Sequence, residues 1–111
     1  GILVRASADG KLWHQAQVGS SSGGYLFGET LVGGAVKRIN LRKDGPTLVR
    51  PAGEWNLYEL RAAGRTITLT VNGEVASEFT ECEVPRGYIG LEAEGYRIEF
   101  RNLRVKPLVP R

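Results

Sequence analysis

A chain of 111 residues, 41% of them hydrophobic, is long enough to bury the core of one small domain. Its net charge of +3 comes from Lys and Arg residues spread along the chain, and the densest basic stretch, at 36–43, has no interleaved aromatic residues. Nucleic-acid binding is therefore not predicted. Cys82 is the only cysteine, which excludes an internal disulfide, and no run of about 18 apolar residues indicates a membrane span.

Short β-prone runs separated by glycines predict strands in the first half of the chain. In KLWHQAQV, at 11–18, alternation places Trp13, Gln15 and Gln17 on one face and His14 on the other. The rest of this half is expected to form a strand at 1–7, one or two strands of open register at 25–41, and loops at 19–24 and 42–54.

The clearest local pattern is a β-hairpin at 65–79. Its first strand alternates apolar residues with threonines up to Asn72 and Gly73. Both turn residues tolerate the positive φ that a type I′ turn needs. A strand at 54–63 is expected to precede this hairpin, because apolar and polar residues alternate there too.

The end of the chain also alternates. We expect one strand whose apolar face is turned to the core and, after a corner at Gly95, a last strand that bulges at Asn102. The apolar residues of these two strands are Ile89, Leu91 and Ala93, then Ile98, Phe100, Leu103 and Val105.

No stretch keeps a helical period over three turns. The alternating runs therefore predict an all-β fold, an antiparallel β-sandwich or jelly roll. We expect one domain at 1–108 and a tail at 109–111, where prolines block further strand pairing.

Four pieces of the second half carry a family resemblance. They are GEWN at 53–56, ITLTVNGEV at 67–75, GYIGLEAEG at 87–95 and IEFRNLRVKPL at 98–108. In order and spacing they resemble the 3-keto-disaccharide hydrolase domain family, and GILVR and WHQAQV are similar to earlier strands of the same family.

The resemblance implies a concanavalin A-like β-sandwich of two curved sheets with its ligand site on the concave sheet. It implies exported bacterial proteins that act on glycans or oxidised sugars, some of which cleave 3-keto-glycosides. It also implies that this chain is about the last three fifths of the family's domain, without its first strands. Two positions depart from the family: Gln15 stands where relatives place a carboxylate, and Glu94 where several carry His.

Glu92 and Glu94 are the first candidate site residues. They alternate with the apolar residues of their strand, so both carboxylates point away from the core, roughly 7 Å apart. Like charges at this spacing raise one pKa, which suits a general acid, a base or a hard-cation site with Glu94 as ligand. The alternatives are a solvated surface and cross-strand pairing with Arg97 or Arg101.

The second candidate group is Trp13, Gln15 and Gln17, with Arg97 as a further substrate-binding residue. Amide groups and an aromatic ring are what sugar recognition uses, although a polar solvent face gives the same pattern. His14, the only histidine, is expected to be either a buried, hydrogen-bonded residue or an exposed one without a catalytic role, since no nucleophile-elbow motif accompanies it and a zinc site needs more ligands. Trp55 is expected to be a core or strand-start residue.

Three functions remain open. The first is cleavage of a (3-keto-)glycoside with Glu94 and Glu92 as catalytic residues and, as one alternative, a divalent cation. The second is a non-catalytic carbohydrate-binding module on the same face. The third is an assembly domain that self-associates or accepts a strand at an exposed sheet edge. The partner is then a glycan, an oxidised disaccharide or a protein chain.

Overall fold

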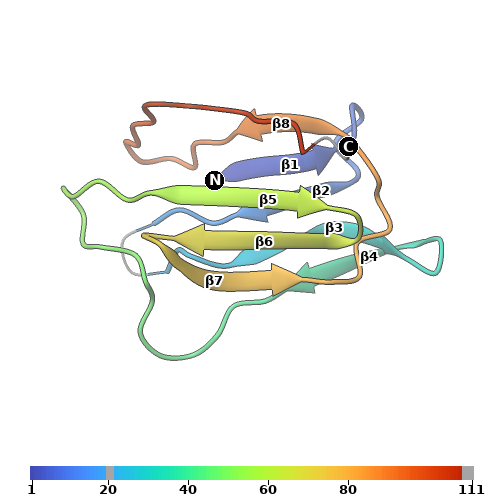
Figure 1. Cartoon of the computed structure of the whole chain (residues 1–111), viewed down its shortest axis with the longest axis horizontal. Coiled ribbons are helices and arrows are strands. Elements are labelled where there is room, and N and C mark those ends of the chain that lie inside the picture. Colours follow the sequence, from blue (N-terminus) through green and yellow to red (C-terminus); the bar gives the residue numbers. More distant parts are fainter. Residues whose placement is uncertain (20–21, 109–111) are drawn as a thin grey trace.

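In the computed structural model, which describes residues 1–19 and 22–108, the chain is an antiparallel β-sandwich without helix. Figure 1 shows the smaller sheet in front of the larger one. The larger sheet has the order β4-β3-β2-β1-β8, formed by β1 (Ile2–Ala6), β2 (Trp13–Ala16), β3 (Leu26–Val32), β4 (Ala35–Asn40) and β8 (Tyr88–Leu91). The smaller sheet has the order β5-β6-β7, formed by β5 (Tyr58–Ala63), β6 (Thr66–Val71) and β7 (Glu74–Phe79). The all-β fold predicted from the alternation is confirmed.

Two hairpins show how local sequence sets the register. Asn72 and Gly73 join β6 to β7 with φ of 51° and 87°, as predicted for a type I′ turn. Gly33 and Gly34, with φ of 58° and 81°, form the equivalent turn between β3 and β4. This turn sets the register of these two strands, which the sequence left open. The predicted tail at 109–111 and part of the predicted loop at 19–24 lie outside the described residues.

The core lies between the two sheets. Its buried apolar residues come mainly from the inward face of β6 and from β2 and β3. Phe79 at the end of β7 and, after it, Cys82 and Val84 complete the cluster. The most completely buried apolar side chains are those of Ala16, Ile67, Leu69 and Val71, and Thr30 and Gln15 are the most completely buried polar ones.

His14 is buried in this core, which decides between the two alternatives that the sequence left open, and both ring nitrogens have hydrogen-bond partners. Its Nδ1 lies 3.2 Å from the carbonyl oxygen of Val4 and its Nε2 2.8 Å from Oγ1 of Thr30. The Nδ1–H tautomer satisfies both contacts, with the threonine hydroxyl donating to Nε2. Cys82 Sγ lies 3.6 Å from the same Nε2. Burial lowers the pKa of His14, so the ring is neutral in the folded protein.

The last part of the chain differs from the prediction. Ile89, Leu91 and Ala93 were expected in the core, yet all three are exposed. The smaller sheet has only three strands, and β8 lies beyond its β5 edge, so no described strand covers the inward face of β8 (Figure 1). The expected last strand is absent as well: residues 97–105 form no ladder, although Asn102, with φ of 56°, does break the extended chain where a bulge was predicted.

Trp55 is a further correction. It was expected in the core or at the start of a strand, but β5 begins only at Tyr58 and the Trp55 side chain is exposed. The guanidinium of Arg101 stacks 3.8 Å from its ring centroid. None of the described segments is a long apolar helix of the kind that crosses a membrane.

Candidate functional site

The outer face of the larger sheet, turned away from the core, carries the predicted polar group. His14 and Ala16 point into the core from β2. Trp13 and Gln15, which alternate with them, therefore point outward, and Gln17 continues that face just past the end of the strand. The prediction that these three residues share a face is confirmed.

Aromatic residues of β3 extend this face beyond what the sequence analysis identified. Phe27 pairs with Gln15 in the register, and its ring meets Trp13 edge-on at 5.3 Å and Tyr25 at 5.6 Å between centroids. Arg38 on β4 lies 5.6 Å from the Trp13 ring centroid and forms an ion pair of 3.3 Å with Glu29. The alternation of Tyr25, Phe27 and Glu29 was the available signal, but its meaning required the strand register.

The missing side chain of Gly1 leaves a notch in this face, and the Gln15 amide fills that notch. Its backbone continues the pairing of β1 with β8: the Glu92 amide donates to the Gly1 carbonyl at 2.9 Å, and the Gly1 amine donates to the Glu92 carbonyl at 2.7 Å. A Cβ on Gly1 would overlap the side-chain amide of Gln15. Because glycine leaves that space free, Gln15 lies over Gly1, and its Nε2 donates to Oε1 of Gln17 at 3.4 Å.

Glu92 and Glu94 approach each other at the rim of this notch. A hydrogen bond with the Glu94 carboxyl raises the pKa of Glu92, and partial desolvation and the negative charge of Glu94 act in the same direction. The amine of Gly1 opposes the shift. The sequence prediction that these two carboxylates are close enough to interact agrees with this arrangement.

The arginines expected nearby do not neutralise the pair. Arg97 forms an ion pair with Glu99 at 3.6 Å, with 85% of its side chain exposed, and Arg101 stacks on Trp55. In the described part of the chain, neither Glu92 nor Glu94 belongs to an ion pair with an arginine or lysine. The cross-strand pairing considered above is therefore wrong, and Arg97 is not brought to the notch.

Two tyrosines fix the backbone around the notch. The Tyr58 hydroxyl donates to the carbonyl of Gln17 at 2.9 Å from the smaller sheet, and burial raises its pKa to about 12. The Tyr96 hydroxyl donates to the carbonyl of Val18 at 3.2 Å. Tyr96 therefore ties the segment that carries Glu94 to the end of β2.

A metal site is not assembled here. Over residues 1–19 and 22–108, no group of three or more His, Cys, Asp or Glu side chains is arranged to hold an ion. Glu94 and Glu92 offer carboxylates alone, so any cation would depend on ligand oxygens from a substrate or on water.

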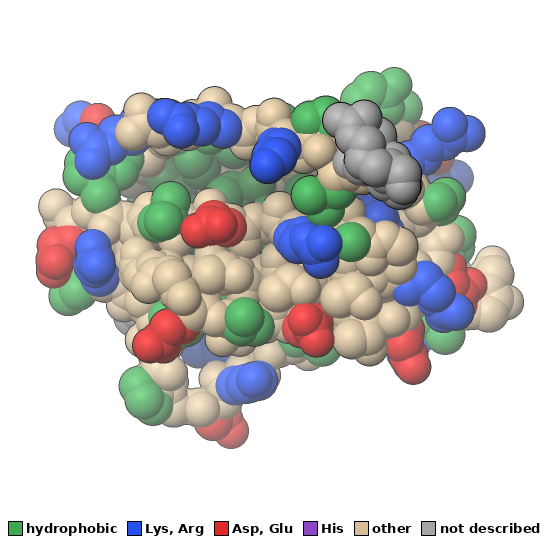
Figure 2. Space-filling model, viewed as in Figure 1, with side chains coloured by type: hydrophobic (Ala, Val, Ile, Leu, Met, Phe, Trp, Pro, Cys, Tyr) green, Lys and Arg blue, Asp and Glu red, His purple; other side chains and the backbone are tan. Residues whose placement is uncertain are grey.

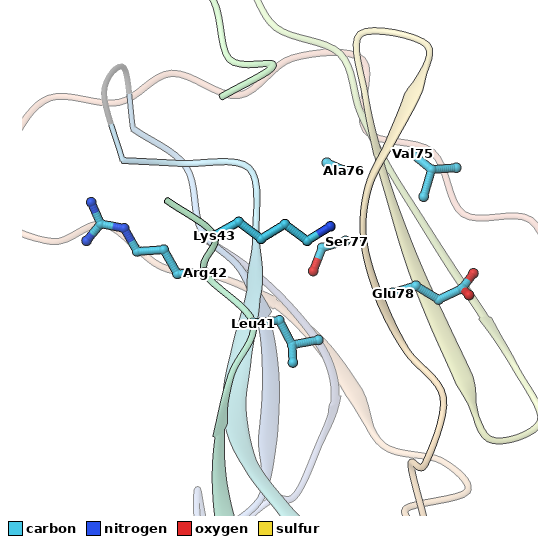
Figure 3. Close-up of a pocket in the computed structure, with 7 residues that line it drawn as sticks. All are labelled: Leu41, Arg42, Lys43, Val75, Ala76, Ser77 and Glu78. Carbon is cyan, nitrogen blue, oxygen red and sulfur yellow. The ribbon is translucent and has the colours of Figure 1, made fainter. Parts of the chain in front are cut away.

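The hollows of the surface lie elsewhere. One, of about 310 Å³, opens between the segment after β4 and the edge of β7 (Figure 3). In Figure 3 the Lys43 side chain reaches across toward β7, whereas Glu78 points away. A second hollow of about 350 Å³ adjoins it along the loop at 41–48. None of the predicted site residues lines either hollow.

The comparisons with known proteins agree with the sequence resemblance. A family described as "3-keto-alpha-glucoside-1,2-lyase-like domain" matches residues 1–106. Comparison with curated proteins gave no match, and comparison with solved structures gave none.

Proposed function

Because the chain belongs to the 3-keto-alpha-glucoside-1,2-lyase-like domain family, we propose that the outer face of its larger sheet binds a 3-keto-glycoside and cleaves the glycosidic bond by elimination. The observation that carries the proposal is the interacting pair Glu92–Glu94 beside the Gln15–Gln17 amides. Fold alone would not support it, since β-sandwiches serve many functions.

The chemistry needs one base and one acid. A keto group at C3 acidifies the C–H at C2, so a carboxylate can remove that proton. The electron pair left on C2 forms the C1=C2 double bond as the C1–O bond breaks, and the leaving oxygen takes a proton from an acid. Glu94 is our candidate base, and Glu92 the acid, because its raised pKa favours the protonated form.

The rest of the face supplies binding groups. The half-buried Gln17 offers an amide donor and acceptor for sugar hydroxyls, and Gln15, which is almost fully buried, holds the Gln17 amide in place by a hydrogen bond. Trp13 lies four residues from Gln17, about 13 Å along an extended strand. That distance places an aromatic platform and the polar notch under different rings of a disaccharide, so both rings would contact this face.

A carbohydrate-binding module without turnover is the second candidate. It is favoured by Gln15 and Glu94, which replace the carboxylate and the histidine expected from the resemblance. The same amides and aromatic rings would then bind the sugar, and the two carboxylates would only orient hydroxyls. Location outside the cytoplasm of a bacterium stays a prediction from the resemblance.

The test follows 3-keto-glucosides and their parent disaccharides by NMR, with and without Mn²⁺ or Ca²⁺. We expect turnover of the keto sugars alone, lost in Glu94→Gln and retained in the matched control Glu74→Gln, which removes an exposed carboxylate on β7. Binding without turnover would support the module instead. Absence of both binding and turnover would refute a carbohydrate site on this face.

A further inference from the structure

An edge strand and a strand-like segment of the described chain both lack a partner. β5 is the edge strand of the smaller sheet, and in the described chain its only ladder is with β6. Residues 97–105 alternate like a strand, with Ile98 and Phe100 half-buried between exposed charged residues, yet they pair with no strand. Unpaired edges of this kind are templates for pairing with another chain.

Apolar side chains are exposed along the same part of the molecule. Figure 2 shows hydrophobic side chains at the base of a hollow between the front sheet and the upper band of the molecule, where Figure 1 places β8 and the segment after it. Monomeric proteins rarely expose contiguous apolar patches of more than a few hundred Å². The large apolar residues exposed in this part of the chain are Tyr88, Ile89, Leu91, Tyr96, Leu103, Val105 and Leu108.

The exposed charges of the two edges are complementary. β5 presents Glu59 and Arg61, and the unpaired segment presents Arg97, Glu99 and Arg101. In an antiparallel register with Leu60 opposite Phe100, two of the three charges of the segment meet opposite charges of β5, and Arg97 faces Ala63. The pairs are then Glu59 with Arg101 and Arg61 with Glu99, while Ala62 faces Ile98.

We propose that two copies of this chain form a twofold dimer by exchanging residues 97–105, each segment pairing with the partner's β5 and covering the partner's exposed β8. In Figure 1 the segment runs in the same direction as β5. A twofold axis normal to the smaller sheet reverses the partner, which gives the antiparallel pairing that matches the charges. Gly95, with φ of 76°, lies in the connection where the exchanged strand would leave its own copy.

Pairing within one chain could match the same charges only in a parallel register, with Glu59 opposite Arg97 and Arg61 opposite Glu99, and the structure does not adopt that register. Arg101 stacks on Trp55 in this structure, three residues before β5 begins, so the segment is displaced along β5 in its own copy. Exchange of the segment breaks the exposed contact between Arg101 and Trp55. It forms two ion pairs in each of the two symmetry-related strand pairings of the dimer. The proposal concerns assembly and does not depend on the carbohydrate site.

Sedimentation velocity over a wide range of concentration, on the whole chain, measures the dimer. We expect Arg61→Glu to weaken dimerisation by on the order of tenfold, because the twofold axis places two like-charge contacts in each dimer. Arg61→Glu combined with Glu99→Arg should restore it. Glu74→Arg, on the opposite edge of the sheet, is the control and should have no effect.

Disulfide trapping then fixes the register. Glu59→Cys with Arg101→Cys should form a covalent dimer, whereas Glu59→Cys with Arg97→Cys, the pair matched in a parallel register, should not. A monomer at all concentrations overturns the proposal. A dimer whose affinity is unchanged by the charge reversals also overturns it, and so does a monomer in which the double variant Glu59→Cys with Arg97→Cys forms an internal disulfide.

Discussion

Protonation of His14 should make the folded protein sensitive to mild acid. Burial is the largest effect on the pKa of this histidine and holds it below its usual 6.5 in the folded state. Hydrogen bonds with the backbone of Val4 and Arg5 oppose this shift of the pKa, and the charge of Arg5 acts in the same direction as burial. The unfolded chain therefore takes up the proton first as the pH falls. The stabilisation is complete above pH 6.5 and is lost as the pH falls from there toward the folded-state pKa.

The size of the effect follows from the burial of the ring. Only 2% of His14 is exposed, and Phe79 stacks on it, so the imidazolium has little access to water. One proton taken up only by the unfolded state changes the free energy of unfolding by at most about 1.4 kcal/mol per pH unit. Between pH 6.5 and pH 5, the loss is therefore at most about 2 kcal/mol, or at most about thirtyfold in the folding equilibrium.

Urea unfolding followed by tryptophan fluorescence, at half-unit steps between pH 7.5 and pH 5, measures this loss. His14→Gln removes the titrating group. The pH dependence of its free energy of unfolding therefore reports the contribution of all other residues. The difference between the two proteins isolates His14. If both lose stability in parallel, the buried histidine is not the cause and the argument is wrong.

Substitutions at two positions test how the core and the loop are held. Thr30→Val keeps the shape but removes the hydroxyl that donates to His14, so we expect a loss of about 1–2 kcal/mol by urea denaturation, limited because Cys82 lies near the same nitrogen. An unchanged midpoint would show that the hydroxyl contributes nothing. Asn72 has φ of 51° and its side chain bonds Leu48 and Leu57, so Asn72→Ala should cost about 2–3 kcal/mol. Asn72→Gly should cost about 1 kcal/mol less, because glycine tolerates positive φ; equal losses would contradict the assigned strain.

Local patterns predicted the parts of this fold that local physics determines. The Asn72–Gly73 hairpin and the outward face of Trp13, Gln15 and Gln17 follow from turn chemistry and from the period of a strand. The pairing of Glu92 with Glu94 needed only their spacing.

The errors arose where the outcome depends on distant partners. The apolar face of Ile89 and Leu91 has the pattern of a core strand, but its burial requires a strand opposite β8, which only the sheet order reveals. The segment at 97–105 likewise alternates without a partner in the described chain. The contribution of Phe27 to the candidate site could not be predicted, because it depends on its register with Gln15.

The most direct test of the central claim is to locate the sugar on the protein. In NMR spectra of ¹⁵N-labelled protein titrated with a methyl 3-keto-glucoside, the side-chain amides of Gln15 and Gln17 should shift first and furthest. The backbone amides of Lys43 and Ala76, which line the hollow beside β7, should stay in place. Shifts confined to that hollow, with the two glutamines unmoved, would contradict the assignment of the site to the outer face of the larger sheet.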